Sequence, residues 1–416
     1  MNASRPRAVI TGLGAITPLG LSVKEFWEGL VAGRSGVTRI SQFDASALPC
    51  QIAGEVKGFE AKNYMDFKEA RRMSRSSQLA LAAAKEAMAD AGLSGFADPE
   101  RAGVVLATAA GGLEKIDEGI SVLRQRGWDK VNPFIPPNAL CNMPGHHVSK
   151  TYQALGPLTT IVTACAAGTQ AVGEAAELIR RGAADVVITG GVEATIQDFM
   201  IGSFCAMRAL PTNYNDRPAQ ASRPFTKDRE GFVYSEGSGV LIVERLEHAQ
   251  QRGARIYAEV VGHSASSDAY DVAKPDPTAA GAIRAMRWAL QDAGLVPDDV
   301  DYINAHGTST PVGDLAETSG IKAVFGPRAA SLPVSSTKSM IGHAMGAAGA
   351  LEAIVCALTV HTDVVHPTIN YEVPDPECDL DYVPNTARQV PVHIALSNSF
   401  GLGGQNACLI LKKFEA

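Results

Sequence analysis

Short apolar runs alternate with amphipathic stretches along most of the chain. The apolar runs predict buried strands, and the stretches with apolar residues at helical spacing predict helices. The predicted strands are residues 8–11, 103–108, 160–163, 185–189, 239–245, 256–262, 300–305, 392–396 and 407–411. The predicted helices are 22–32, 72–91, 166–181 and 279–293. Strands and helices that alternate in this way are typical of an α/β protein whose sheets are covered on both faces.

The stretch around Cys165 is the most informative one for chemistry. A predicted buried strand ends here, and the helix over 166–181 follows, closed by Gly182. Cys165 therefore lies at a helix N-terminus, where free backbone N–H groups and the helix dipole lower the pKa of a thiol. We interpret Cys165 as a candidate nucleophile. The alternative is a small buried thiol without a chemical role.

Three other stretches predict irregular structure. Residues 12–18 begin like a dinucleotide-binding fingerprint but have Thr17 in place of the third glycine, and we interpret them as a tight turn. Residues 123–150 contain four prolines and predict an extended excursion. Residues 211–236 predict a long loop.

Composition limits the classes of function. The 416 residues are 46% hydrophobic and 19% charged, with a formal net charge of −7, so no basic excess suggests nucleic-acid binding. Seven cysteines without CxxC pairs suggest neither a disulfide framework nor a zinc site. No hydrophobic leader follows Met1, and no later apolar run is judged long enough to span a membrane. We expect a cytoplasmic protein without a membrane partner.

Two histidines lie in glycine-flanked loops. His306 follows the predicted strand 300–305, and His343 lies in the small-residue run 335–349. Either could be a satisfied core residue, but together with Cys165 they indicate a composite site. Neither loop has the ligand spacing of a metal site. The glycine-rich stretch 397–406 precedes a strand and has no GK[ST], which excludes a P-loop and favours a hinge or a loop of backbone donors.

Four motifs together resemble the β-ketoacyl-[acyl-carrier-protein] synthase family, most closely its elongating type I/II. They are the Cys165 stretch, HGTSTPVGD at 306–314, TKSMIGHAMGAAGA at 337–350 and NSFGLGGQN at 398–406. The resemblance implies the thiolase fold, with two similar α/β halves in a five-layer αβαβα arrangement, and a homodimer. It places the halves at 1–255 and 256–416.

The resemblance also assigns roles to the motif residues. Cys165 is similar to the nucleophile that accepts an acyl chain, and His306 and His343 to the pair that assists decarboxylation of malonyl-[acyl carrier protein]. Lys338 resembles the supporting lysine of the family, with Glu352 as its charge partner. The implied reaction is a decarboxylative Claisen condensation that elongates a fatty-acyl or polyketide-type chain by two carbons. It needs no metal and no redox cofactor, because phosphopantetheine carries the substrates.

The remaining assignments concern binding. Phe400 resembles the gate residue, and the backbone N–H groups of Phe400 and Cys165 would form the oxyanion hole. Thr308 and Thr310 are similar to the pair that contacts the pantetheine arm, and Ala110 stands where the family often has a branched residue that closes the acyl pocket of the partner subunit.

An acidic carrier protein needs a local basic patch on this acidic chain. The densest candidate is Lys68, Arg71, Arg72 and Arg75, although an ordinary solvated helix face is an equally good interpretation. Leu402, Gln405 and the run Tyr234-Ser235-Glu236 depart from the family pattern, which leaves the gate and the substrate open. A non-catalytic partner subunit of the chain-length-factor kind is the alternative function, but such subunits lack the nucleophile.

Overall fold

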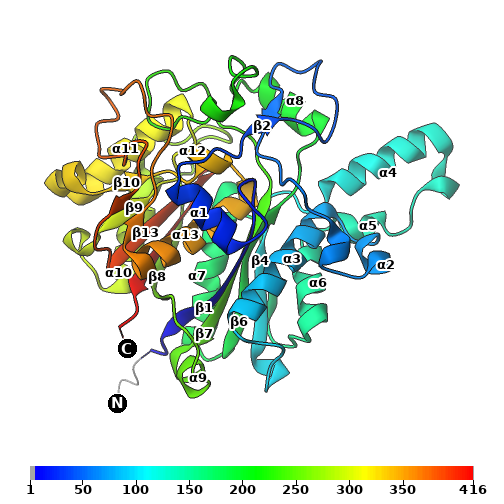
Figure 1. The fold of residues 1–416 in the computed structure, drawn as a ribbon, viewed down its shortest axis with the longest axis horizontal. Helices are drawn as coiled ribbons and strands as arrows, with labels where there is room; N and C mark the ends of the chain where they lie inside the picture. The colour runs from blue at the N-terminus through cyan, green and yellow to red at the C-terminus, as the bar shows by residue number, and fades with distance from the viewer. Residues whose placement is uncertain (1–4, 416) are drawn as a thin grey trace.

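The computed structural model describes residues 5–415 and contains one large mixed sheet (Figure 1). The first part of the chain supplies β1 (Ala8–Ile16), β4 (Ala102–Ala107), β5 (Leu158–Ile161), β6 (Val186–Glu193) and β7 (Gly237–Arg245). The second part supplies β8 (Ala258–Ser267), β9 (Tyr302–Asn304), β10 (Val334–Ser335), β13 (Ile394–Gly401) and β14 (Gln405–Lys413). The strand order is β10-β9-β13-β14-β8-β1-β7-β6-β4-β5.

The order of strands repeats in the two parts of the sheet. From the middle outward, β1-β7-β6-β4-β5 and β8-β14-β13-β9-β10 each start with two antiparallel pairings and end with two parallel ones. A short antiparallel pairing between β1 and β8, from Ala8 with Val260 to Ile10 with Ala258, joins them. The two similar α/β halves implied by the motifs are therefore present in the topology.

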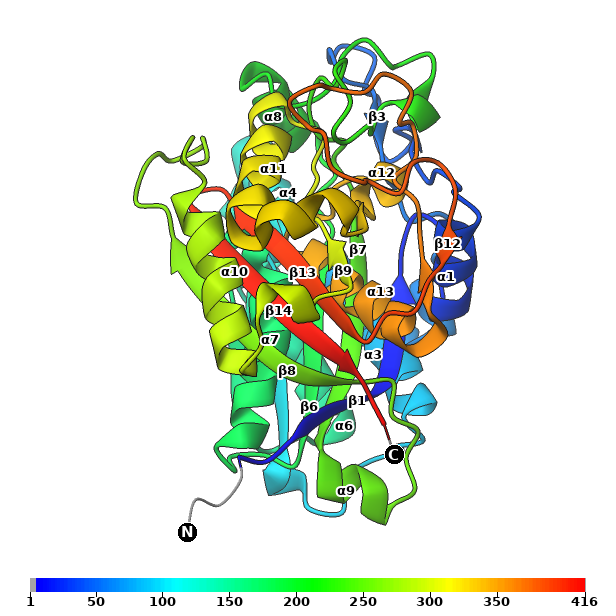
Figure 2. The same cartoon turned by 90° about the vertical axis from the view of Figure 1, so that its left-hand side faces the viewer.

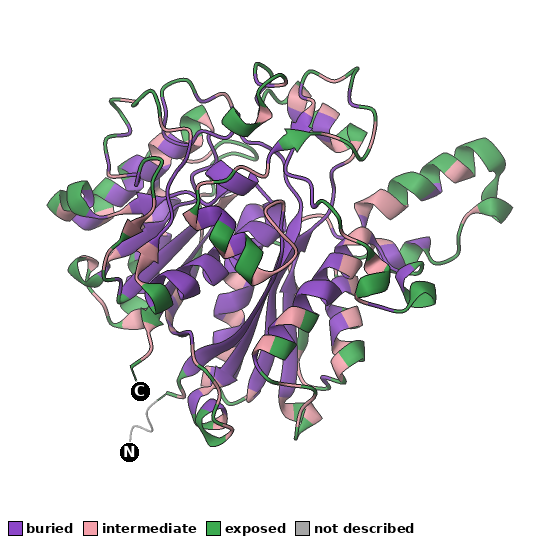
Figure 3. Ribbon diagram, in the orientation of Figure 1, coloured by how far each residue is buried: buried purple, intermediate pink, exposed green. Residues whose placement is uncertain are grey.

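Helices cover both outer faces and fill the space between the halves (Figures 1 and 2). On the first half, α3 (Arg75–Asp90) packs on β1 and β7, and α6 (Met143–Tyr152) packs on α3 and β4. On the second half, α10 (Ala280–Ala293) packs on β8 and β14, with α11 (Pro311–Phe325) beside it. Between them, α7 (Ala167–Arg180) and α13 (Ala348–Thr362) contact each other and strands of both halves, and this central layer is buried (Figure 3).

The central layer depends on two glycines. A Cβ atom at Gly168 of α7 would lie 2.6 Å from the Ala350 backbone nitrogen, and one at Gly349 of α13 would lie 2.5 Å from the Thr169 backbone nitrogen. These distances are shorter than carbon and nitrogen atoms tolerate, so the two helices can approach this closely only without side chains there. The close crossing fixes the starts of both helices, which carry the site described below.

Apart from α4, which is as long as α7, the remaining elements have at most nine residues. They are α1 (Val23–Val31), α2 (Phe67–Ala70), α4 (Leu113–Arg126), α5 (Ile135–Ala139), α8 (Asp198–Ala206), α9 (Leu246–Gln251), α12 (Lys338–Ile341), the pair β2 (Thr38–Arg39) and β3 (Ile52–Ala53), and the pair β11 (Val364–Val365) and β12 (Arg388–Gln389). Ser22 caps α1 through its side chain, as its position predicts.

Three expectations from the sequence are wrong. The first is the tight turn at 12–18, because β1 continues through it to Ile16. A Cβ atom at Gly12 would lie 2.3 Å from the Ala87 carbonyl oxygen, and one at Gly14 would lie 2.0 Å from that of Ala83. These glycines permit close packing of β1 on α3. A local sequence pattern cannot distinguish glycines that form a turn from glycines that contact a helix far along the chain.

The second wrong expectation is the extended excursion at 123–150, which contains most of α5 and α6 and the end of α4. Pro136 and Pro137 lie in the first turn of α5, and Pro144 lies in the first turn of α6. A proline is tolerated in a first turn because its missing N–H would have no partner there. In Figure 1, α4 projects from the body of the molecule.

The third concerns membranes. Residues 345–362 are long and apolar enough to cross a membrane by length and composition, contrary to the sequence expectation, but 89% of this window is buried inside the protein. The window covers the 3₁₀ turn Met345–Ala347 and α13, which follows it. The apolar residues of the window are therefore those of a central core helix. The first four residues, on which the expectation of a missing leader partly rests, lie outside the described residues.

Candidate active site

Cys165 lies in a tight turn between β5 and α7. Residues Ala164–Ala166 form a 3₁₀ turn, and Ala164 has a φ of 49°, which few residues other than glycine adopt. The hairpin between β13 and β14 packs directly on this turn, since a Cβ atom at Gly401 would lie 3.1 Å from the Cys165 nitrogen. The predicted helix start after Cys165 is thus present, although the strand before it differs. It was expected to be buried, but β5 is the last strand of the sheet and Leu158 is 44% exposed.

The electrostatic argument from the sequence is wrong in direction. Burial raises the pKa of the Cys165 thiol to about 11, while the Leu402 backbone N–H and the charge of Lys338 act to lower it. The helix N-terminus does not outweigh the loss of water around the sulfur, because a thiolate in an apolar cavity is poorly solvated. At neutral pH the free thiol is therefore protonated.

The backbone holds the two histidines from different directions. The His306 N–H donates to Glu317 Oε1 at 2.8 Å, and the neighbouring Gly307 N–H donates to Glu317 Oε2 at 2.7 Å. The His343 N–H donates to the Val233 carbonyl at 2.7 Å. These bonds fix both loops through the main chain and leave the imidazoles to the cavity.

The two imidazole rings lie close together and remain uncharged. Their centroids are 5.4 Å apart and their planes nearly perpendicular. Burial, and then the charge of Lys338, lowers the pKa of both histidines well below the usual value. Within residues 5–415, Nδ1 of His306 and both ring nitrogens of His343 have no hydrogen-bond partner. Each neutral ring has one N–H donor and one acceptor nitrogen, so the pair can bind a polar group of a ligand.

Lys338 and Glu352 form a buried ion pair behind the histidines. Both side chains are about 1% exposed, and Lys338 Nζ donates to Glu352 Oε1. Burial raises the pKa of Glu352, and the lysine beside it acts in the opposite direction. The predicted pairing is present, and it places a positive charge near both imidazoles.

A single cavity of about 470 Å³ brings the predicted residues together. Its lining includes Cys165, His306, His343, Thr308, Thr310 and Phe400. The Phe400 ring lies 5.7 Å from that of His306, and the hydroxyl oxygens of Thr308 and Thr310 are 3.1 Å apart. Residues from 165 to 400 therefore meet at one site, as their positions at strand ends and helix starts predict.

Other predicted residues lie elsewhere. Ala110 is half-buried in the loop after β4 and is not among the residues that line this cavity. Lys68, Arg71 and Arg72 are exposed beside α2. Arg75, which the sequence groups with them, instead donates to Glu236 at 2.7 Å and is partly buried by that pairing.

The sequence analysis missed two buried carboxylates. Glu317 holds the His306 loop, and burial raises its pKa to about 7. Glu193, at the end of β6, accepts the backbone N–H groups of Ala109 at 2.8 Å and Gly346 at 3.2 Å. Neither residue lies in a helix or strand predicted from the sequence, so no pattern along the chain marks them as buried.

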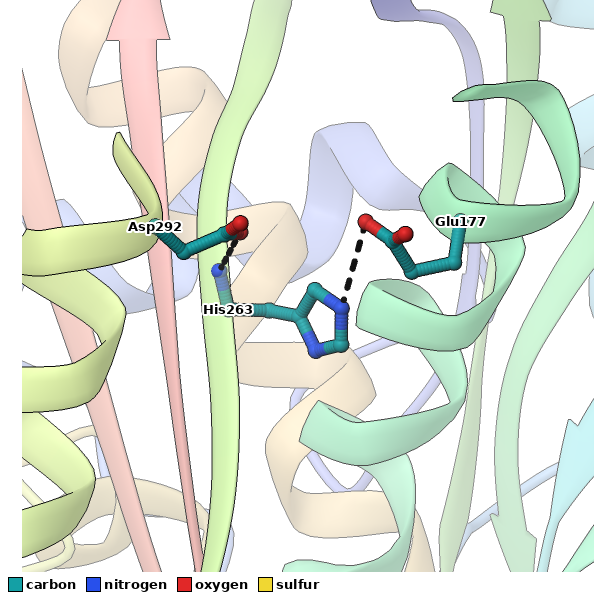
Figure 4. Close-up of side chains that lie close together, drawn as sticks. All are labelled: Glu177, His263 and Asp292. Carbon is teal, nitrogen blue, oxygen red and sulfur yellow. Dashed lines mark hydrogen bonds and ion pairs between the residues drawn. The ribbon is translucent and has the colours of Figure 1, made fainter. Parts of the chain in front are cut away.

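One cluster outside the cavity has the residue types of a metal site. Ligand atoms of Glu177, His263 and Asp292 lie within 4.8 Å of one another (Figure 4). However, Arg180 lies 2.8 Å from Glu177 and 3.1 Å from Asp292, and Arg5 pairs with the same two carboxylates. The two guanidinium groups already neutralise these acids, so the cluster is an ionic link between α7 and α10.

A thiol at a helix start and two neutral imidazoles line one cavity of a duplicated α/β fold, and a buried lysine–glutamate pair lies near the imidazoles. These features define a thiolase-fold condensing enzyme. The chain belongs to the β-ketoacyl synthase family. The family's N-terminal domain, "Beta-ketoacyl synthase, N-terminal domain", matches residues 6–249, and its C-terminal domain matches residues 257–372. The family and the fold class predicted from the four motifs are confirmed.

Relatives of known name match over the whole chain. The chain is 47% identical over 415 residues to 3-oxoacyl-[acyl-carrier-protein] synthase 2 of Synechocystis sp., covering 100% of both chains. It is 48% identical over 411 residues to the protein of the same name from Staphylococcus aureus, covering 99% of both. Among solved structures, a β-ketoacyl synthase from Burkholderia phymatum matches with a TM-score of 0.91 at 35% identity, covering 99% of this chain and 100% of that one.

A second solved structure adds a partner. A type II polyketide ketosynthase, solved in complex with its acyl-carrier protein, matches with a TM-score of 0.91 at 36% identity, covering 99% of this chain and 100% of that one. The names of the full-length relatives favour a condensing acyltransferase over the chain-length-factor alternative.

Proposed function

We propose that this protein condenses malonyl-[acyl carrier protein] with an acyl chain held on Cys165 and so elongates a fatty-acyl chain by two carbons. The observation that carries the proposal is the convergence of Cys165, His306 and His343 on one cavity. In the first step the Cys165 sulfur attacks the acyl thioester, the carrier thiol leaves, and the cysteine proton passes to it. This covalent step separates acyl transfer from condensation.

The second step makes the carbon nucleophile. The bond between the malonyl α-carbon and the carboxylate carbon breaks and CO₂ leaves. The electron pair of that bond stays on the α-carbon and is delocalised onto the thioester oxygen as an enolate. N–H donors of His306 and His343 stabilise the enolate oxygen. The enolate carbon then attacks the acyl carbonyl, and the Cys165 thiolate leaves as the new carbon–carbon bond forms. The backbone N–H groups of Cys165 and Phe400 would bind the oxyanion that develops during this attack.

The assignment of the remaining roles follows the same geometry. Lys338, held by Glu352, keeps the imidazoles neutral because a second buried cation beside it is unfavourable. Thr308 and Thr310, at the cavity lining, would bind the pantetheine arm. We also propose that the chain divides at 255/256, just before β8 begins the second half, and that the protein works in the cytoplasm.

For the carrier, we propose docking on the exposed patch of Lys68, Arg71 and Arg72. Replacing Arg71 and Arg72 by glutamate should raise the KM for the acyl carrier about tenfold and weaken its salt dependence, because like charges would face the acidic carrier. Steady-state kinetics at two salt concentrations test this. The matched control reverses Lys24 and Arg34, which are exposed in α1 and just after it. If both pairs behave like the wild type, the patch is ordinary surface.

We further propose a homodimer built on β5. This strand is the edge of the sheet. Half of the exposed large apolar residues in the described part of the chain belong to the segments around it and to the α4–α5 arm: Ile116, Ile120, Leu123, Trp128, Phe134, Leu140, Leu155, Leu158 and Val162. An unpaired edge strand beside such a patch favours association. Light scattering should find a dimer, and Leu158→Arg should shift it toward monomer.

The deciding experiment supplies acyl-carrier and malonyl-carrier substrates together and measures the elongated 3-oxoacyl product and CO₂. A condensing enzyme forms both. A chain-length-factor-like subunit forms no product without a separate ketosynthase, and that result would overturn the proposal.

A further inference from the structure

His366 is a buried histidine that the mechanism above does not use. It follows β11 and is fully buried. Its Nδ1 lies 2.9 Å from the carbonyl oxygen of Pro367. A carbonyl oxygen can only accept, so Nδ1 carries the hydrogen and Nε2 has the lone pair in the neutral ring. Burial lowers the pKa of His366 to about 4, which agrees with a neutral ring.

The Nε2 lone pair faces four side chains, of which Thr337 is the nearest. Nε2 lies 3.0 Å from Thr337 Oγ1 and 3.3 Å from Asn304 Nδ2. The hydroxyl groups of Tyr302 and Ser335 are farther away, at 3.4 and 3.5 Å, and lie 2.8 Å from each other. Asn304 Nδ2 itself lies 2.9 Å from Thr337 Oγ1. An amide nitrogen only donates, so the threonine oxygen accepts from Asn304 and its own hydrogen is directed to His366. The hydrogen bonds therefore run in one direction, from Asn304 to Thr337 and from Thr337 to His366, because the amide nitrogen only donates and Nε2 only accepts.

These hydrogen bonds connect the loop that carries His306 with the loop that carries Lys338. Asn304 is the last residue of β9 and precedes His306 by two residues, whereas Thr337 immediately precedes Lys338. We propose that His366 is a positioning residue: as the acceptor for Thr337, it sets the orientation of Lys338 relative to His306. Backbone bonds such as Ala305 N–H to Ser335 O, at 2.9 Å, hold the strands together without it. The effect of His366 is thus on geometry within the site.

The consequence concerns one half-reaction. Lys338 acts on the histidines that assist decarboxylation, an assignment that rests on the proposed function. Without Nε2 of His366, the buried hydroxyl of Thr337 has no acceptor. The Thr337–Lys338 turn can then shift until the hydroxyl reaches a different acceptor. Decarboxylation should suffer, whereas transfer of an acyl chain to Cys165 should not.

Two variants, each of which keeps one of the two hydrogen bonds of His366 and loses the other, test the proposal. In His366→Gln the amide oxygen reaches the position of Nε2 and can accept from Thr337. In His366→Asn the shorter amide reaches the position of Nδ1 and can donate to Pro367, but the acceptor is lost. CO₂ release from malonyl carrier and acylation of Cys165 by acyl carrier are measured on the full chain, together with the melting temperature.

We expect His366→Asn to release CO₂ about tenfold more slowly and to be acylated within about twofold of the wild-type rate. His366→Gln should restore decarboxylation to within about twofold. Equal decarboxylation rates in the two variants, or a proportional loss of both half-reactions, would overturn the role. CO₂ release by the unaltered protein tests the proposed function separately.

Thr337→Val gives a second measurement from the other end of the hydrogen bond. It removes the hydroxyl at nearly constant volume and should slow CO₂ release to the same extent as His366→Asn. Thr337→Val also removes the acceptor of Asn304, so the double variant should be no slower than Thr337→Val alone, because the bond between Thr337 and His366 is already lost there. Losses that multiply in the double variant would mean that the two side chains act independently, and the proposal would fail.

Discussion

Each half of the molecule begins its central helix with the same kind of turn, yet the middle residues of the two turns differ in what they can carry. Ala164–Ala166 precedes α7 and Met345–Ala347 precedes α13, and both are 3₁₀ turns. The first residue of each has a positive φ, 49° at Ala164 and 45° at Met345. The second residue is Cys165 in one turn and Gly346 in the other.

The glycine shows why only one turn can carry the nucleophile. A Cβ atom at Gly346 would lie 2.4 Å from the Ala109 nitrogen, so the loop after β4 occupies the space that a side chain would need. In the first turn the equivalent space is the cavity. The duplicated backbone thus supports two uses: it presents a thiol in one half, and in the other it allows the close approach of a loop next to His343.

Burial affects the chemistry of the two halves in opposite ways. It favours the uncharged form of every group in the cavity. For His306 and His343 this agrees with their use as neutral donors, whereas for Cys165 it opposes formation of the reactive thiolate. As the proposed nucleophile, Cys165 would therefore need the bound substrate to take its proton, whereas the two imidazoles are already in the neutral form that their proposed role requires. The following predictions test this difference.

The largest effect is expected for Cys165→Ala. It removes the only atom proposed to form the acyl bond, and alanine fits among the neighbouring alanines, so acylation should vanish while the melting temperature changes little. Intact-mass spectrometry after incubation with acyl carrier measures this directly. A mass shift in the variant would assign the acyl group to another residue.

His343→Ala should divide the reaction. Removing one donor to the enolate oxygen should slow decarboxylation by about 10²–10³-fold, while Cys165 is still acylated. CO₂ release and acyl-enzyme formation, measured separately, decide the matter. If acylation falls as steeply as CO₂ release, the thiol transfers its proton to His343, and the two halves share one base.

The pH dependence should respond to Lys338. In the wild-type protein the lowered pKa of both histidines keeps them neutral, so CO₂ release should stay constant as the pH falls through about 6.5, the usual histidine value. The double variant Lys338→Met with Glu352→Gln removes both buried charges. The pKa of each histidine should then rise, and the acid limb of the pH–rate profile should move to higher pH.

The acid limb should move only part of the way. Burial lowers the pKa of both histidines more than Lys338 does, and burial remains in the double variant. Glu352→Gln alone is the control, since it keeps the lysine charge. An acid limb that stays in place in the double variant would show that Lys338 does not set the protonation of the pair.

Features that depend on neighbouring residues could be predicted from the sequence, whereas features that depend on contacts between distant residues could not. Cys165, His306 and His343 could be found because each lies in a short motif at a helix start or strand end. The direction of the Cys165 pKa shift could not, because it depends on burial by residues far along the chain. Gly12 and Gly14 were misinterpreted for the same reason, since α3 explains them. Glu317 could not be found because its partners are the backbone N–H groups of His306 and Gly307 and the distant side chain of Asn398, which no local pattern reveals.

The smallest expected effect concerns the length of the acyl chain. Ala110 lies in the loop after β4, whose neighbour Ala109 is held by Glu193, and in the proposed dimer it would close the partner's acyl pocket. An alanine there leaves a deeper pocket than a branched residue, and each additional buried methylene contributes about 0.8 kcal/mol. Ala110→Ile should therefore leave the rates with short acyl chains unchanged and reduce those with long chains by about fourfold per excluded methylene. Kinetics over a series of acyl carriers measure this, with Ala110→Ser as the control that keeps the volume small. An unchanged chain-length profile would mean that Ala110 is small only because the subunits pack closely at that point.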